Sequence, residues 1–248
     1  MFKKNLYRVI EKFPILVRMR AEYWRRKHLL FWKIGHYQSL SRRESDIQTY
    51  LDQQKVRKLQ VGCWPYMREG WLNTELYGSK ELVPLDLLKP FPLPTSSIDY
   101  IFSEHVHEHF SFQQGQVMLK EFYRVLRKNG KIRLATPDLQ FLIDLYGKTP
   151  SPLQKKYIQW SSSEFKLENN QATHVINNFM RAWGHQFIYD FKTLKWALEQ
   201  VGFVDVVQCK PGKSSDPHLK NLESHWKSTS QEFNNLETLV VEARKNVR

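Results

Sequence analysis

The chain has 248 residues, of which 41% are hydrophobic and 14% aromatic, enough for one domain of good size plus an appendage. No apolar run approaches the ~18 residues that a membrane-spanning helix needs. The N-terminus lacks the apolar segment and cleavage site of a secretory signal. Two cysteines, Cys63 and Cys209, argue against a disulfide framework and favour a reducing cytoplasm, although the sequence leaves a bridge between them open.

The net charge of +13 is concentrated at the N-terminus. Residues 1–58 hold 15 Lys and Arg against 5 Asp and Glu, whereas residues 59–248 hold 23 against 20. This distribution argues against a uniformly basic nucleic-acid-binding body, so nucleic acid is a disfavoured partner.

The basic segment has apolar residues at helical spacing over residues 4–37, with Pro14 kinking this helix or starting a second one. Such a helix can pack on the main domain or on a protein partner, with its basic side chains solvated. It can also lie on an anionic membrane surface, through residues 1–40. The first interpretation is favoured, and the protein is expected to be cytoplasmic, with peripheral membrane contact left open.

From residue 57 onward, strands and helices alternate. Strands are predicted at 59–63, 72–76, 82–87, 97–105 and 131–137. A helix over 113–130 is closed by Asn129-Gly130, and a second helix runs from Leu139 to Tyr146 with Asp138 as its cap.

Residues 148–190 are less regular, and a helix over 191–203 ends at Gly202. Strands 204–210 and 236–244 follow, joined without a helix. The pattern indicates an α/β sheet with a late antiparallel element. Ligands bind such sheets beyond the carboxyl ends of the strands, here at Gly62-Cys63, Glu75, Asp86, Ser103 to His105, and Ala135 to Asp138.

Five segments carry a family resemblance: GWLNTE (70–75), Asp86 with KPFP (89–92), IDYIFSEHVHEHF (98–110), EFYRVLRKNGKIRLATPDL (121–139) and GHQFIYDFKTLKWALEQVGF (184–203). Over roughly residues 57–245 the chain resembles class I S-adenosylmethionine-dependent methyltransferases, in particular a small bacterial branch with GWLN, PFP and FSEH…EH motifs. The resemblance implies a Rossmann-like, mostly parallel seven-stranded sheet with a late antiparallel strand. Residues 1–56 would form a basic helical extension, and residues 57–248 the methyltransferase-like domain, with a lid-like insertion at about 147–190.

The resemblance also implies S-adenosylmethionine as cofactor and a small-molecule or saccharide acceptor. Glu75 would accept the ribose hydroxyls and Asp86 the adenine amino group; each could instead be a surface turn acid. The residues expected at the cofactor are Gly62, Cys63, Trp64, Glu75, Asp86, Leu87, Ser103 and Glu104.

The stretch QVGCWPYMREGW (60–71) departs from the family pattern. Gly62 supplies the tight turn, but Trp64 stands where a second glycine would let the backbone approach the cofactor. The large ring could occupy the cofactor's space or turn outward. We interpret the stretch as a degenerate cofactor loop that still binds S-adenosylmethionine.

Two histidines are candidate catalytic residues, His105 and His185. His185 could remove a proton from an acceptor hydroxyl or amine, or it could be a cap or packing residue. His105 to His109 match the zinc-protease signature H-x-x-E-H, which needs one helix and a third ligand that the sequence does not mark, so no metal site is expected. His107 is expected to face solvent, and His109 to pack at the start of the following segment.

Two classes of function remain. The leading one is methyl transfer from S-adenosylmethionine. The alternative is a non-catalytic pseudo-methyltransferase that docks to a membrane or partner through its basic N-terminus. The bulky residues Trp64 and Tyr66 in the cofactor loop favour this alternative.

Overall fold

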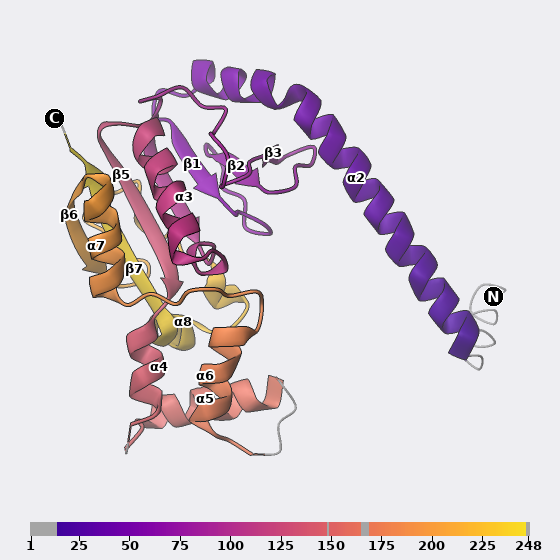
Figure 1. Ribbon diagram of the computed structural model, residues 1–248, viewed down its shortest axis with the longest axis vertical. Coiled ribbons are helices and arrows are strands. Elements are labelled where there is room, and N and C mark those ends of the chain that lie inside the picture. Colours follow the sequence, from indigo (N-terminus) through magenta and orange to yellow (C-terminus); the bar gives the residue numbers. More distant parts are fainter. Residues whose placement is uncertain (1–13, 148, 165–168, 247–248) are drawn as a thin grey trace.

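A seven-stranded sheet organises the protein (Figure 1). The computed structural model describes residues 14–147, 149–164 and 169–246, with side chains from Lys33 onward. The strands are β1 (Lys58–Val61), β2 (Leu72–Glu75), β3 (Val83–Pro84), β4 (Ile98–Glu104), β5 (Leu126–Pro137), β6 (Phe203–Cys209) and β7 (Thr238–Lys245). Their order in the sheet is β3-β2-β1-β4-β5-β7-β6. Strand β7 runs antiparallel to both its neighbours, and the other pairings are parallel, which confirms the predicted fold class.

The helical elements are α2 (Pro14–Gln53), η1 (His107–His109), α3 (Phe112–Val125), α4 (Leu139–Leu145), α5 (Pro152–Glu164), α6 (Ala172–Arg181), α7 (Phe191–Val201), η2 (His225–Lys227) and α8 (Gln231–Glu237). Helices α3 and α7 lie against one face of the sheet (Figure 1). Helices α4, α5 and α6 gather beyond the end of β5, where parallel strands present their carboxyl ends.

Helix α2 covers most of the segment predicted as an N-terminal extension, and in Figure 1 it runs away from the sheet. It begins at Pro14 in the described chain and continues to Gln53, well past the predicted end at residue 37; the predicted start at residue 4 lies outside the described residues. Its last turns pack on the domain through the buried side chains of Ile47 and Leu51. None of the described helices combines the length and the apolar character needed to cross a membrane.

The main core forms between the sheet and α3. Met118, Leu119, Phe122 and Val125 are fully buried along one face of this helix, and burying such a side chain contributes about 1.5–3 kcal/mol. Ser111 begins the helix with a capping box: its hydroxyl accepts from the Gln114 amide while the Gln114 side chain accepts from the Ser111 amide.

The sequence places the end of α3 wrongly. The helix ends at Val125, and Leu126 is already extended and pairs with Ile98 in the sheet. Asn129 has a φ of +62°, so Asn129-Gly130 makes its turn inside β5 instead of closing the helix. Leu126 is fully buried and Arg127 pairs with Asp99, and these contacts favour the sheet over continued helix.

Helices also occur where the sequence predicts none. Residues 148–190 contain α5 and α6, and α8 lies between β6 and β7, which are therefore not joined without a helix. These short helices share a second core, to which Tyr157, Val175 and Phe233 contribute. Their stability comes from this packing, because isolated helices of this length are marginal in water.

Candidate active site

The carboxyl ends of the parallel strands are level with one another. Val61 pairs with both Thr74 and Ser103, and Glu75 pairs with Pro84. Gly62, Glu75 and Asp86 therefore meet at one edge of the sheet, as predicted, and all three line a cavity of about 520 Å³. This volume lies within the ~300–1,000 Å³ typical of small-molecule sites.

Gly62 forms the turn that leaves β1. Its φ is +62°, and a Cβ atom built on it would lie 2.3 Å from Cγ2 of Val106. Only glycine fits this turn without displacing Val106, which also lines the cavity.

Trp64 borders the cavity instead of filling it. Trp64 is 57% exposed, and the volume of about 520 Å³ is the space that remains with its ring in place. The Trp64 amide donates to Oε2 of Glu75 at 3.4 Å. The neighbouring Cys63 is buried and lines a smaller cavity of about 190 Å³. Burial, aided by the charge of Glu75, raises the pKa of the Cys63 thiol to about 12, so the thiol stays protonated and unreactive.

Both predicted cofactor acids lie at the rim of the larger cavity. Glu75 accepts from the Leu76 amide at 2.9 Å in addition to the Trp64 amide. Asp86 accepts from the Leu88 amide at 3.0 Å and faces Lys89, whose Nζ is 3.2 Å from its Oδ2. A carboxylate has about four lone-pair sites, so each acid retains acceptor capacity for a ligand.

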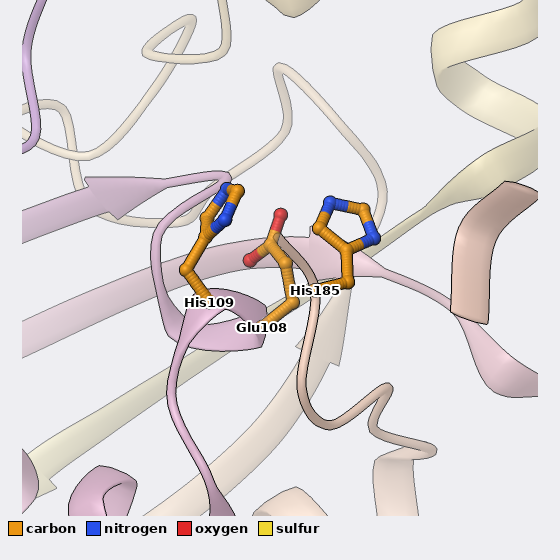
Figure 2. Close-up of side chains that lie close together, drawn as sticks. All are labelled: Glu108, His109 and His185. Carbon is orange, nitrogen blue, oxygen red and sulfur yellow. The ribbon is translucent and has the colours of Figure 1, made fainter. Parts of the chain in front are cut away.

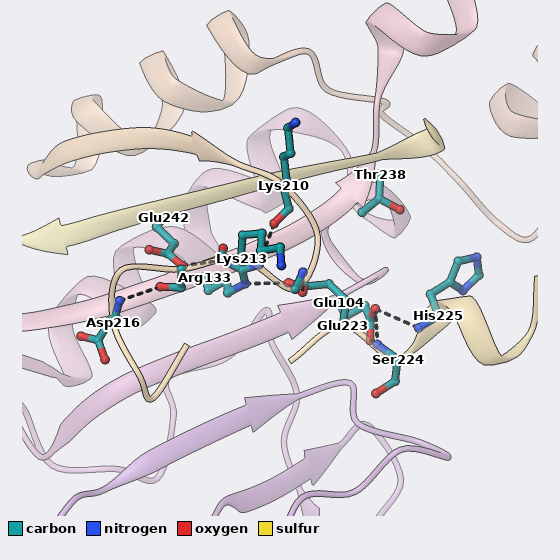
Figure 3. A network of polar contacts seen from close by, with 12 residues as sticks. Glu104, Arg133, Lys210, Lys213, Asp216, Glu223, Ser224, His225, Thr238 and Glu242 are labelled. Atoms are coloured by element: carbon teal, nitrogen blue, oxygen red, sulfur yellow. Dashed lines mark hydrogen bonds and ion pairs between the residues drawn. The ribbon is translucent and has the colours of Figure 1, made fainter. Parts of the chain in front are cut away.

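The other predicted cofactor residues differ in their surroundings. Leu87 lines the cavity with Asp86. Ser103 is buried inside the sheet and is absent from the lining of the cavities described here. Glu104 lines the smaller cavity, but its carboxylate accepts from the amides of Ser224 and His225 at 2.8 to 3.0 Å (Figure 3).

A polar network joins the segment between β6 and α8 to strands β4, β5 and β7 (Figure 3). The fully buried guanidinium of Arg133 pairs with Glu223 and Glu242. With the Glu104 contacts, this network fixes His225, whose ring centroid lies 4.0 Å from that of His105.

A second cavity, of about 480 Å³, adjoins the first. His105 and His109 line both. The other residues that line the second cavity are Glu108, Pro137, Tyr157, Trp160, Ser161, Glu164, Phe179, Trp183, His185, His225, Thr229 and Glu237. The two histidines predicted as catalytic, His105 and His185, are thus brought to one cavity.

His105 stands between the two cavities. Its Nδ1 donates to Oε1 of Glu108 at 3.1 Å, and its Nε2 is buried without a hydrogen-bond partner among the described residues. Burial acts to lower the pKa of His105, but the hydrogen bond and charge of Glu108 outweigh it and raise this pKa above its ordinary value. A carboxylate that orients an imidazole is the usual arrangement behind a histidine base.

His185 is oriented differently. Its Nδ1 lies 2.7 Å from the carbonyl oxygen of Phe179. A carbonyl can only accept, so Nδ1 carries the proton and Nε2 carries the lone pair. Burial lowers the pKa of His185, which keeps the ring neutral at pH 7.

The prediction for His107 is wrong. It is 1% exposed and packs against Tyr189, with ring centroids 4.9 Å apart and the ring planes tilted by 49°. Burial lowers its pKa to about 4. The short helix η1 turns His107 inward, and because η1 spans only residues 107–109, the single helix that the zinc-protease signature requires is not formed.

The sequence missed three residues of the second cavity, His225, Glu237 and Tyr157. Nε2 of His225 lies 3.4 Å from Oε1 of Glu237, and the Tyr157 hydroxyl donates to the other oxygen of this buried carboxylate. They come from α5 and from the polar stretch between β6 and β7, where no local pattern marks them.

Comparison with known proteins supports the resemblance. Residues 49–134, about a third of the chain, match the model of a methyltransferase-domain family. No curated protein matches the chain. Together with the observed sheet, this match supports the resemblance to class I S-adenosylmethionine-dependent methyltransferases. It also supports S-adenosylmethionine as the cofactor.

Several solved structures are similar in fold. An S-adenosylmethionine-dependent methyltransferase from Archaeoglobus fulgidus is 15% identical, with 82% of this chain and 92% of that chain covered and a TM-score of 0.45. Haemonchus contortus phosphoethanolamine N-methyltransferase 2, in complex with S-adenosyl-L-methionine, is 15% identical, with 82% and 52% covered and a TM-score of 0.42. This chain spans about half the length of the Haemonchus enzyme. At these identities the similarity concerns the fold alone.

Proposed function

We propose that this protein transfers a methyl group from S-adenosylmethionine to a hydroxyl or amine of a small-molecule or glycan-type acceptor. The observation that carries the proposal is the pair of adjoining cavities at the carboxyl edge of the sheet, which share His105 and His109 as a common wall. A two-substrate reaction needs such adjacency, because the reacting atoms must be held in line and close together.

The first cavity fits the cofactor. Gly62 has no Cβ, which keeps the backbone open at the turn, and Glu75 and Asp86 offer carboxylate oxygens for the ribose hydroxyls and the adenine amino group. Leu87 adds an apolar wall beside Asp86. When bound, S-adenosylmethionine supplies a methyl group that its positive sulfonium makes electrophilic.

The second cavity fits an acceptor. Its aromatic wall, which includes Tyr157, Trp160 and Trp183, offers ring faces to a sugar or another flat, partly apolar molecule. His105 lines this cavity and Glu108 orients its Nδ1, so a ring movement that exposes the buried, unpartnered Nε2 would let it take up the acceptor's proton. Loss of this proton leaves the acceptor atom a better nucleophile.

The proposal is tested first by calorimetry with S-adenosylmethionine and S-adenosylhomocysteine. The wild type should bind both, and Asp86→Ala should weaken binding by about 1–3 kcal/mol, which is about 5- to 150-fold. Asp52→Ala is the matched control, because Asp52 is an exposed acid of α2 that does not line the cavity. No binding by the wild type at millimolar ligand overturns the proposal and favours the non-catalytic alternative.

Catalysis is tested by S-adenosylhomocysteine release with a panel of saccharides, other alcohols and amines. His105→Gln should retain cofactor affinity while lowering turnover by about 10²–10⁴-fold, the usual contribution of a positioned base. Undiminished turnover in His105→Gln would exclude His105 as the proton acceptor.

A further inference from the structure

Three side chains of the second cavity converge in a way that neither the cofactor site nor a proton acceptor requires. Glu108, His109 and His185 each offer one ligand atom, and these atoms lie within 4.8 Å of one another (Figure 2). Glu108 and His109 belong to η1, and His185 belongs to the segment that leads into α7.

The backbone holds the two segments together. The carbonyl oxygen of Glu108 accepts from the amides of Gln186 and Phe187, at 2.7 and 3.2 Å. The side chain of Gln186 donates to the carbonyl oxygen of His109 at 2.8 Å. His185 is therefore fixed beside η1 although it lies more than 70 residues away in the sequence.

The side chains are oriented as ligands usually are. Nδ1 of His185 donates to the Phe179 carbonyl, which leaves the Nε2 lone pair available. Oε2 of the fully buried Glu108 accepts from the Thr136 hydroxyl at 3.1 Å, and its Oε1 accepts from His105. Metal-binding histidines and carboxylates are held by outer hydrogen bonds of this kind.

The charge of the cavity also favours a cation. Among the residues that the structure describes, its lining includes three glutamates, Glu108, Glu164 and Glu237, but no lysine or arginine. Among the described residues, the side chains that hydrogen-bond to the Glu108 carboxylate are the His105 imidazole and the Thr136 hydroxyl. A fully buried carboxylate costs free energy unless a cation or hydrogen bonds compensate it.

We propose that Glu108, His109 and His185 together bind one divalent transition-metal ion. Two imidazoles and one carboxylate suit Zn²⁺, Mn²⁺, Fe²⁺ or Co²⁺, whereas Mg²⁺ and Ca²⁺ favour oxygen ligands alone. With bonds of about 2.0–2.1 Å, tetrahedral ligand atoms lie roughly 3.4 Å apart, so each ligand atom would move inward by at most about 0.8 Å. The rings of His109 and His185 are half-buried, and their rotation would supply most of this movement.

Three protein ligands leave a coordination position open to the cavity. This part of the inference rests on the proposed function: the open position would hold an acceptor oxygen and lower its pKa. A metal-bound acceptor oxygen would narrow the acceptor class from hydroxyls and amines to hydroxyl-bearing molecules. The proposed ligands also differ from those of the H-x-x-E-H pattern, in which His105 would bind the metal. Here His105 hydrogen-bonds to Glu108 instead, and His185 is the third ligand.

The test is direct metal binding to the full-length, untagged chain after removal of metal by a chelator. Titration with Co²⁺ should give saturable visible absorption bands with one ion per chain, and Zn²⁺ should displace it. His109→Ala and His185→Ala should each weaken Co²⁺ binding at least 10-fold, and Glu108→Gln likewise where it folds. His174→Ala is the matched control: His174 lies on α6, bonded to Asn169 and outside the cluster, and this variant should bind as the wild type does.

Absence of saturable Co²⁺ binding by the wild type, or undiminished binding by both histidine variants, would overturn the metal site. Cofactor binding is measured by calorimetry on the same samples. Intact S-adenosylhomocysteine binding without metal binding defeats the metal site alone, and metal binding without cofactor binding defeats the proposed function alone.

Discussion

Gly62→Ala probes the turn on which the cofactor cavity depends. The added methyl group would lie 2.3 Å from Cγ2 of Val106, in a backbone whose φ is +62°. The left-handed conformation costs an L-residue about 1–2 kcal/mol, and overpacking typically costs about 1–3 kcal/mol. The free energy of unfolding should therefore fall by about 2–5 kcal/mol, which for a domain of this size corresponds to roughly 4–20 °C in thermal midpoint.

A double-mutant cycle separates the two causes. Val106→Ala removes Cγ2 but keeps Cβ, which would lie at an ordinary 3.5 Å from the new methyl group. In that background Gly62→Ala should cost only the conformational part, about 1–2 kcal/mol. Urea denaturation of the wild type, both single variants and the double variant measures the coupling. Additivity within about 0.5 kcal/mol would refute the contact, and an undiminished stability of Gly62→Ala would refute the whole argument.

Three further predictions concern other parts of the chain. Trp64→Gly should leave S-adenosylhomocysteine affinity unchanged or lower, because the ring borders the cavity and is 57% exposed; calorimetry that detects binding only in the variant would show that the ring blocks the site. The hydrogen bond from Arg124 holds the pKa of Glu121 below its ordinary value, so the pair stabilises the fold above pH ~4.5 and this contribution is lost as the pH falls through the lowered pKa. Glu121→Gln should lower the free energy of unfolding at pH 7 by about 1 kcal/mol or less, because the pair is partly exposed. It should also weaken the loss of stability between pH 7 and pH 3; denaturation curves that lose stability over this range as the wild type does would contradict this. Deletion of residues 1–33 keeps the contacts that α2 makes with the domain from His36 onward, so the thermal midpoint should not fall. The deletion should abolish any salt-sensitive binding to anionic vesicles. Vesicle binding by the truncated chain would exclude the basic segment as the membrane contact.

Helix boundaries show how far local chemistry reaches. Asp138 accepts from the Gln140 amide at the start of α4, and Gly202 ends α7 with a φ of +109°, both as predicted. A cap depends on residues two or three positions away, so the sequence contains the whole signal. Asn129-Gly130 carries a similar signal, yet it lies inside β5, because the pairing of Leu126 with Ile98 is a long-range contact that local propensity does not include.

The sequence by itself determined the α/β class, the strands that end in Gly62, Glu75 and Asp86, and the convergence of these residues on one edge, because alternation and turn residues are local and parallel strands share a carboxyl edge. Only the tertiary structure decided the second cavity. It turned His107 inward, laid His225 over His105, and brought His185 to Glu108. These placements depend on hydrogen bonds of backbone amides between segments about 80 to 120 residues apart, and no local spacing encodes such contacts.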